Sequence, residues 1–247
     1  MALLGFDDTI HAYIWFPEMR TALVPGDHIN EKSLQERGRS MPQLGPYTIK
    51  DNQARKDRTE LIDGNIYPMK LYFPLYATWL REFYFCIRNY LKEHQPEIRA
   101  FEFVGVQLDR DEATLIVPDI AIVKDPEKLA NGTFVYGAPE MVVEMLANDP
   151  ADRERDLYLK LPKYASSGVQ QYWILDPEHK RLAVYDFSMA QLPMIHSFDE
   201  TVAVPVIAPE FAIDFKEMSR KVDKFFEVQK LTRRLMEQKG RSLPPQQ

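Results

Sequence analysis

The stretch "PEMVVEML", residues 139–146, combines a run of apolar side chains with a single embedded acid, Glu144. Burying an ionised carboxylate alone is very costly, so a buried acid is usually paired, protonated or bound to a metal ion. A second apolar run, "TLIVPDIAIV" at residues 114–123, likewise carries one acid, Asp119. Two buried strands of this kind predict that the fold brings two acids together.

Hydrophobic spacing predicts helices and strands on both sides of these two runs. Residues 59–69 contain Asp63-Gly64 between short apolar segments, and such a pair favours a two-residue hairpin turn with positive φ. Apolar residues recur at helical spacing over 74–94, where Pro74 suits a first turn. The other expected elements are strands at 101–108, 171–176 and 181–187, a helical stretch within 149–169 ending at Gly168, and a charged amphipathic helix from Lys216 onward.

Strands interleaved with helices in this order predict an α/β or α+β fold with a central mixed sheet flanked by helices. Of the 247 residues, 45% are apolar and 28% charged, as in a soluble globular protein with a substantial core. We expect three segments along the chain. They are an N-terminal extension at 1–45, one folded domain at 46–215, and a charged helix with a disordered end at 216–247.

Net charge and cysteine content help to exclude some classes of protein. The net charge is −6, so the chain lacks the overall basic character of many nucleic-acid binders. That counts little against a metal-dependent nuclease, because its site needs acidic residues. The single cysteine, Cys86, rules out an internal disulfide and fits a reducing compartment. The chain shows neither a signal-peptide pattern at its start nor an apolar run of about 18 residues, so we expect a cytoplasmic protein without membrane spans.

The two embedded acids suggest a metal site. Strand residues alternate between faces, so Glu144 shares a face with Val142 and Leu146, and Asp119 on an adjacent strand could meet it. Two close carboxylates repel each other unless a cation lies between them. A hard divalent cation with oxygen ligands satisfies this requirement, and Mg²⁺ or Mn²⁺ would then activate water and hold a phosphodiester.

After Glu144 in the sequence, a lysine is spaced so that it shares one helix face with an acid and a tyrosine. Asp156, Lys160 and Tyr164 are four residues apart, so a helix presents them on one face. Lys160 could orient the attacking water or stabilise the charge that develops on the phosphate. Asp156 could instead form a purely structural pair with Lys160. Pro162 is expected to kink or break this helix, because proline lacks the N–H group and crowds the preceding turn.

The ordered set of motifs resembles the prokaryotic putative restriction endonuclease family, once catalogued as a domain of unknown function, within the PD-(D/E)XK nuclease superfamily. The resemblance covers roughly residues 47–215. Its individual motifs are short, but their order is specific. They are "ELIDG" at 60–64, "VPDIAIV" at 117–123, "GAPEMVVEML" at 137–146 and "RDLYLKLPKYASSGVQQYWILDP" at 155–177.

This resemblance implies a restriction-endonuclease-like core and metal-dependent hydrolysis of DNA. It assigns Asp119, within the Pro-Asp pair, and Glu144 as metal ligands. It places the catalytic lysine at Lys160 on the following helix, because Leu146 stands where many superfamily members have lysine. Glu60 matches the family's upstream acid, which would complete the metal shell or serve only the hairpin. A homodimer would suit cleavage of both DNA strands.

Several positions depart from the family pattern. Ala147 stands where a serine is frequent, and Gln171 replaces an acid. The first long helix begins "FPLYATW" without the early histidine that the family often has. These departures keep a second hypothesis open, in which the chain is a catalytically weak or inactive nuclease fold that serves as a nucleic-acid or protein interaction module. A third hypothesis is an enzyme for another phosphoester.

Overall fold

The computed structural model describes residues 44–108, 112–129, 132–146, 149–189 and 192–238. The extension expected at 1–45 therefore lies almost entirely outside the described residues. Ala147 and the end of the chain after residue 238 also lie outside them. The remaining predictions can be compared with the structure.

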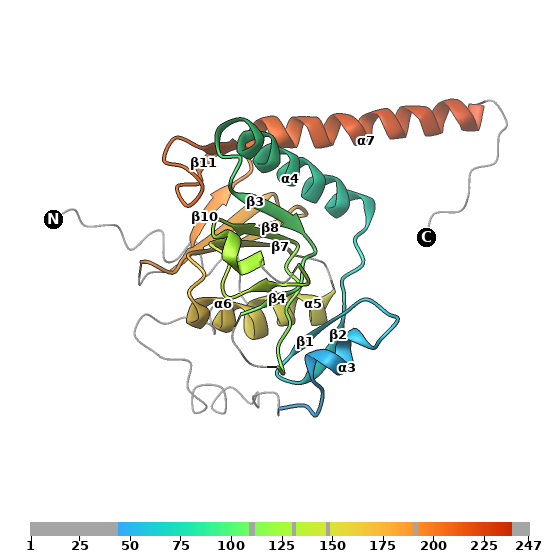
Figure 1. Ribbon diagram of the computed structural model, residues 1–247. Helices are drawn as coiled ribbons and strands as arrows, with labels where there is room; N and C mark the ends of the chain where they lie inside the picture. The colour runs from blue at the N-terminus through green and yellow to red at the C-terminus, as the bar shows by residue number, and fades with distance from the viewer. Residues whose placement is uncertain (1–43, 109–111, 130–131, 147–148, 190–191, 239–247) are drawn as a thin grey trace.

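A six-stranded mixed sheet forms the centre of the molecule, as expected (Figure 1). The central pair β7–β8 is parallel, whereas every other neighbouring pair in this sheet is antiparallel. The strands, in spatial order, are β10 (Met194–Ser197), β9 (Arg181–Asp186), β8 (Gln171–Asp176), β7 (Met141–Met145), β5 (Ile120–Val123) and β3 (Arg99–Glu102).

Helices cover both faces of this sheet, which confirms the predicted fold class (Figure 1). On one face lie α4 (Pro74–His94) and α7 (Phe215–Gln238), and Phe83 of α4 packs on Trp173. On the other face lies a continuous helical segment of three parts, in which Tyr164 packs on Tyr172. The parts are α5 (Pro150–Glu154), the π-helical turns Arg155–Lys160, and α6 (Leu161–Ser167).

The hairpin and the long helix, which had the clearest sequence patterns, formed as expected. β1 (Thr59–Ile62) and β2 (Asn65–Pro68) make an antiparallel hairpin around Asp63 and Gly64, whose φ values are 50° and 69°. Asparagine, aspartate and glycine tolerate this left-handed region best, so the turn follows directly from the sequence. The predicted helix at 74–94 is confirmed at both ends.

Two predicted strands were wrong in extent. Only Ile120–Val123 of the run 114–123 belongs to the central sheet, while Leu115 forms an isolated bridge to the β1–β2 hairpin. Pro118 explains the break, because it has no N–H group for a ladder hydrogen bond. Likewise, the run 101–108 is divided between two strands, since the chain turns at Phe103 with φ 52°.

The sequence did not reveal several short elements. Most of them hold loops around the sheet rather than the candidate site. They are α3 (Ile49–Gln53), the 3₁₀ turn Pro126–Leu129, β6 (Val135–Tyr136), β10, β11 (Thr201–Ala203) and β12 (Ala212–Asp214), whereas β4 (Val106–Gln107) is the second part of the predicted run 101–108. Among the described residues, no helix is both long and apolar enough to cross a membrane.

Candidate active site

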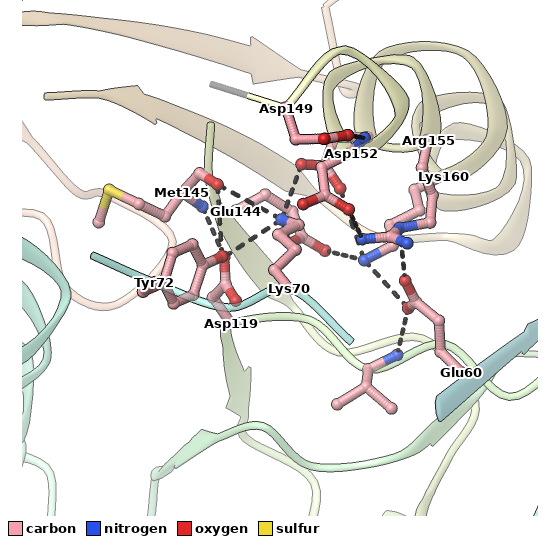
Figure 2. A network of polar contacts seen from close by, with 12 residues as sticks. Glu60, Lys70, Tyr72, Asp119, Glu144, Met145, Asp149, Asp152, Arg155 and Lys160 are labelled. Carbon is pink, nitrogen blue, oxygen red and sulfur yellow. Dashed lines mark hydrogen bonds and ion pairs between the residues drawn. The ribbon is translucent and has the colours of Figure 1, made fainter. Parts of the chain in front are cut away.

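The register of β5 and β7 brings Asp119 and Glu144 together. Ile120 pairs with Val143 in this antiparallel ladder, so the residue before β5, Asp119, lies across from Glu144. Both side chains point to the face that α5 and α6 cover, and Glu144 is fully buried. Figure 2 shows the two carboxylates within one polar network.

Two neutral donors hold Asp119 in place. The Met145 backbone N–H donates a hydrogen bond to Asp119 Oδ2 over 2.6 Å, and the Tyr72 hydroxyl donates to the same oxygen over 2.5 Å. One carboxylate oxygen of Asp119 is thus fixed by both β7 and the segment that precedes α4 (Figure 2). The carboxylate therefore has a defined orientation toward Glu144.

The ammonium group of Lys70 lies between the acids, and the sequence analysis did not anticipate it. Lys70 Nζ is 2.6 Å from Glu144 Oε2, 2.7 Å from Asp156 Oδ2 and 3.4 Å from Asp119 Oδ2. The backbone carbonyl oxygen of Met145 is also 3.4 Å away. Four oxygens thus surround one cationic centre, and the Lys70 side chain is only 4% exposed.

Lys160 lies on the other side of Glu144. Its Nζ is 2.8 Å from Glu144 Oε1, 3.0 Å from Glu60 Oε2 and 3.5 Å from Asp156 Oδ1. The structure therefore brings the predicted lysine to the predicted acids. It also places Asp156 against both lysines, so the helical pair with Lys160 exists but is only part of its environment.

A π-helical turn explains how Lys160 can point at Glu144 although Pro162 follows two residues later. The Leu161 N–H bonds to the Asp156 carbonyl, five residues earlier, and Pro162 then lies in the first turn of α6. Proline is accommodated there because the π-helical register replaces the ordinary bonds to the carbonyl four residues earlier, which proline can neither make nor avoid crowding in a regular α-helix. The helix therefore continues past Pro162 with an altered hydrogen-bond pattern and without a break. Lys160 still points at Glu144. Single π turns in α-helices occur frequently at functional sites.

Glu60 lies at the end of the polar network that is farther from Lys70. It accepts a hydrogen bond from the Val117 backbone N–H over 3.0 Å, and its other oxygen is 2.8 Å from Arg155 Nε. Arg155 is buried, although charged side chains ordinarily face solvent. Lys160 therefore links Glu60 to Glu144. The role of Glu60 as a metal ligand stays a prediction.

Burial and neighbouring charges set the pKa values of these acids in opposite directions. Burial, reinforced by the charge of Glu144, raises the pKa of Asp119 to about 7, although Lys70 opposes it. Burial likewise raises the pKa of Asp156 to about 6. For Glu144 burial alone would raise the pKa, but Lys160 and Lys70 together lower it to about 2. Burial would lower the pKa of Lys160, yet Glu144 and Glu60 raise it above its ordinary value.

These pKa values predict that the protein is more stable at pH 5 than at pH 8. The folded chain binds a proton at Asp119 below about pH 7, whereas the unfolded chain does so only near 3.8, so stability falls as pH rises through this window. For Asp119 alone the difference is about 2 kcal/mol, since one pKa unit corresponds to about 1.4 kcal/mol. Urea unfolding at both pH values measures it.

The Asp119→Asn variant is the control for this pH dependence, because it cannot take up the proton. Its stability difference between pH 5 and pH 8 should be smaller than that of the wild type by about the same 2 kcal/mol. Histidines elsewhere contribute equally to both proteins and cancel in the comparison. An identical pH dependence in the two proteins would contradict the raised pKa of Asp119.

The donor set around Lys70 fits a hard divalent cation. All four groups are oxygens, which are the ligands that Mg²⁺ and Mn²⁺ take from carboxylates and carbonyls. Asp156 is fully buried, and neither of its carboxylate oxygens accepts a well-aligned hydrogen bond among the described residues. Within the same described part of the chain, no three His, Cys, Asp or Glu side chains are arranged to hold a metal ion as they stand.

Gln171, which departs from the family pattern, has a structural role outside this network. Its amide donates to Asp186 over 3.0 Å and its carbonyl oxygen accepts from the Trp173 indole over 3.2 Å. The contact with Asp186 ties β8 to its neighbour β9, whereas the contact with Trp173 lies within β8. The loss of an acid at this position therefore leaves the carboxylate network unchanged.

Comparison with known proteins agrees with this fold. No curated protein matches the chain. Among solved structures, the chain is similar to a putative nuclease of the DUF820 family from Anabaena variabilis, with 21% identity and a TM-score of 0.59. The match covers 72% of this chain and 99% of that chain, and at this identity it shows a shared fold.

The family described as "Putative restriction endonuclease", named Uma2, matches residues 46–216, which is more than half of the chain. This match confirms the resemblance that the ordered motifs indicated. The two comparisons together with the mixed sheet support a nuclease-like fold. The chain belongs to the Uma2 family of putative restriction endonucleases.

Proposed function

We propose that the chain is a metal-dependent endonuclease that hydrolyses DNA phosphodiester bonds with Mg²⁺ or Mn²⁺. One observation carries this proposal. Carboxylate oxygens of Asp119, Glu144 and Asp156, with the Met145 carbonyl oxygen, lie within 3.4 Å of one cationic centre. Asp119 and Glu144 would hold the metal ion, and Asp156 is a third candidate ligand.

The chain's own residues have separate roles in this function. A bound divalent cation would supply activation of water and stabilisation of charge on the phosphate. The Met145 N–H and the Tyr72 hydroxyl orient Asp119, so this acid keeps its position toward the metal site. Lys160 stays protonated near neutral pH, and its positive charge would stabilise the negative charge that develops during phosphodiester hydrolysis.

Cleavage of supercoiled plasmid DNA tests this function. We expect nicking that requires Mg²⁺ or Mn²⁺, stops on chelation, and falls by about a hundredfold in Asp119→Asn, the scale of losing one preorganised group at an active site. The amide oxygen of asparagine is a weaker ligand than a carboxylate, so some activity remains. Asp223→Asn, an exposed aspartate on α7, is the matched control.

Two results would contradict the proposal. One is a preparation of folded wild type that never nicks DNA with either metal ion. The other is equal nicking by wild type and Asp119→Asn, which would point to a contaminating nuclease. A parallel screen of small phosphodiesters separates DNA cleavage from action on another phosphoester.

One observation favours a second function, that of a non-catalytic interaction module. Lys70 already balances the carboxylates that a metal ion would otherwise bridge. A chain with this permanent arrangement would bind DNA without cleaving it, and the binding would weaken with salt because phosphate contacts release counterions. Binding at low salt together with no cleavage in any metal ion supports this module. Metal-dependent nicking excludes it.

A further inference from the structure

The segment that carries Lys70 is held mainly by two side chains. Residues 69–73 connect β2 to α4 without regular structure. Leu71 is 92% exposed and Phe73 is 71% exposed, whereas Lys70 and Tyr72 reach inward to the carboxylates. Leu71 and Phe73 would therefore lose little apolar packing if the Lys70 side chain moved outward, whereas Tyr72 packs on Tyr76 and Phe103 and stays against the core.

The backbone of this segment is anchored at its two ends. The Met69 N–H donates to the Arg58 carbonyl over 3.0 Å, and the Phe73 carbonyl accepts from the Ala77 N–H over 3.1 Å at the start of α4. Between these anchors, the polar contacts that the described residues make with this segment are those of the Lys70 and Tyr72 side chains. The Lys70 ammonium is thus the main electrostatic tie of the segment to the site.

The buried charges also indicate what could take the place of Lys70. Five acids face three bases in this network: Glu60, Asp119, Glu144, Asp156 and the partly buried Asp152 against Lys70, Lys160 and Arg155. A divalent cation in place of the Lys70 ammonium would raise the positive charges from three to four, closer to the number of acids. A divalent cation added beside Lys70 would lie next to the ammonium at the same oxygens, where two like charges repel each other.

We propose that Lys70 is a displaceable internal counter-ion, whose ammonium occupies the divalent-cation position between Asp119, Glu144 and Asp156 until a metal ion expels the Lys70 side chain. The ammonium and the metal ion use the same oxygens. Mg²⁺ needs ligand distances of about 2.0–2.1 Å, so it would lie in contact with the ammonium if both stayed. Metal binding and withdrawal of Lys70 are therefore one exchange.

This inference rests on the proposed function and concerns how its metal site opens. Lys70 lowers the apparent affinity for metal ions, because only the fraction of molecules with Lys70 withdrawn can bind them. The wild-type protein thereby keeps its carboxylates neutralised when metal ions are scarce. The exchange can be measured without any cleavage assay.

Calorimetric titration of Mn²⁺ into wild type and Lys70→Gln is the direct test. If Lys70 is withdrawn in fewer than about one molecule in ten, its removal lowers the apparent Kd for Mn²⁺ by at least about tenfold. Lys163→Gln is the matched control, since Lys163 loses the same charge but pairs with Asp63 at the hairpin turn. The double variant Lys70→Gln/Asp156→Asn should lose most of the gain if Asp156 is a ligand.

A lysine footprint on the unmodified chain gives an independent readout. Acetylation with a water-soluble reagent, followed by peptide mass spectrometry, should leave Lys70 nearly unlabelled without metal ions because its side chain is 4% exposed. Saturating Mn²⁺ should raise labelling of Lys70 several-fold while labelling of Lys163 stays constant. Mn²⁺ binding without a change at Lys70 would overturn the proposal.

The remaining outcomes are also decisive. Equal or weaker Mn²⁺ affinity in Lys70→Gln overturns the exchange, even where wild type cleaves DNA and the proposed function stands. A gain in affinity supports the exchange, even where no DNA is cleaved. If Lys70→Gln is unfolded without metal ions, refolding in Mn²⁺ supports the proposal, and failure to refold overturns it.

Discussion

Replacing Glu144 by glutamine is expected to lower the free energy of unfolding by about 3–5 kcal/mol at pH 7, the range for breaking a buried ion pair from one side. Glu144 is fully buried, with Lys70 2.6 Å from one oxygen and Lys160 2.8 Å from the other. The amide is nearly the same size but carries no charge. Both ammonium groups would lose their nearest carboxylate, so the loss is electrostatic rather than a cavity effect.

Urea unfolding followed by circular dichroism measures this loss, with Glu217→Gln as the matched control. Glu217 pairs with Arg220 on the exposed surface of α7, where such pairs contribute about 0–1 kcal/mol. The pH dependence gives a second check. The pKa of Glu144 is lowered to about 2, so its contribution is complete above about pH 4.5 and is lost as pH falls through 2. Similar stabilities for both variants at pH 7 would contradict the network.

The sequence predicted Asp119 and Glu144 because each is a lone charge within an apolar run. Lys70 carries the same signal, since it is the single charged residue between Ile66 and Leu75. The physical argument that found the acids applies equally to a lone base, because a buried ammonium also needs a partner. The sequence therefore contained a signal that Lys70 is buried, although it did not show which acids pair with it.

Arg155 and Asp156 illustrate what the sequence could not show. They lie in the run "DRERD" at 152–156, and a run of charges ordinarily faces solvent. Their burial depends on the π-helical turn, which shifts the facing of successive side chains, and on Glu60 and Lys70 arriving from distant segments. Local spacing contains neither piece of information.

The secondary structure could likewise be predicted where it depends on local sequence and not where it depends on distant segments. The hairpin at Asp63-Gly64 and the helix from Pro74 were fixed by turn chemistry and helical spacing. The parallel pairing of β7 with β8 depends on how the helical segment crosses the sheet, so the sequence did not specify it. Strands β10, β11 and β12 have only three or four residues each, which is too short for a periodic pattern to distinguish a strand from a loop.

Replacing Lys160 by glutamine is expected to reduce DNA cleavage by about a thousandfold, at the upper end of the effect of removing one preorganised electrostatic group. Lys160 is buried against Glu144 and Glu60, and these acids raise its pKa above the ordinary value. It is therefore an ammonium throughout the working pH range and cannot serve as the general base. In the proposed function its role would be to stabilise negative charge.

Lys160→Arg separates this electrostatic role from proton abstraction. Arginine keeps the positive charge but has a different shape, so this variant should cleave more slowly than wild type and faster than Lys160→Gln. Each variant is first shown to be folded by thermal unfolding, because the loss of a buried charge also lowers stability. If Lys160 were the base, the arginine and glutamine variants would be equally inactive, and wild-type cleavage would rise with pH until the lysine lost its proton. Two results together would indicate that Lys160 remains charged beside Glu144. One is partial rescue of cleavage by arginine, and the other is a wild-type cleavage rate that does not rise as a lysine loses its proton.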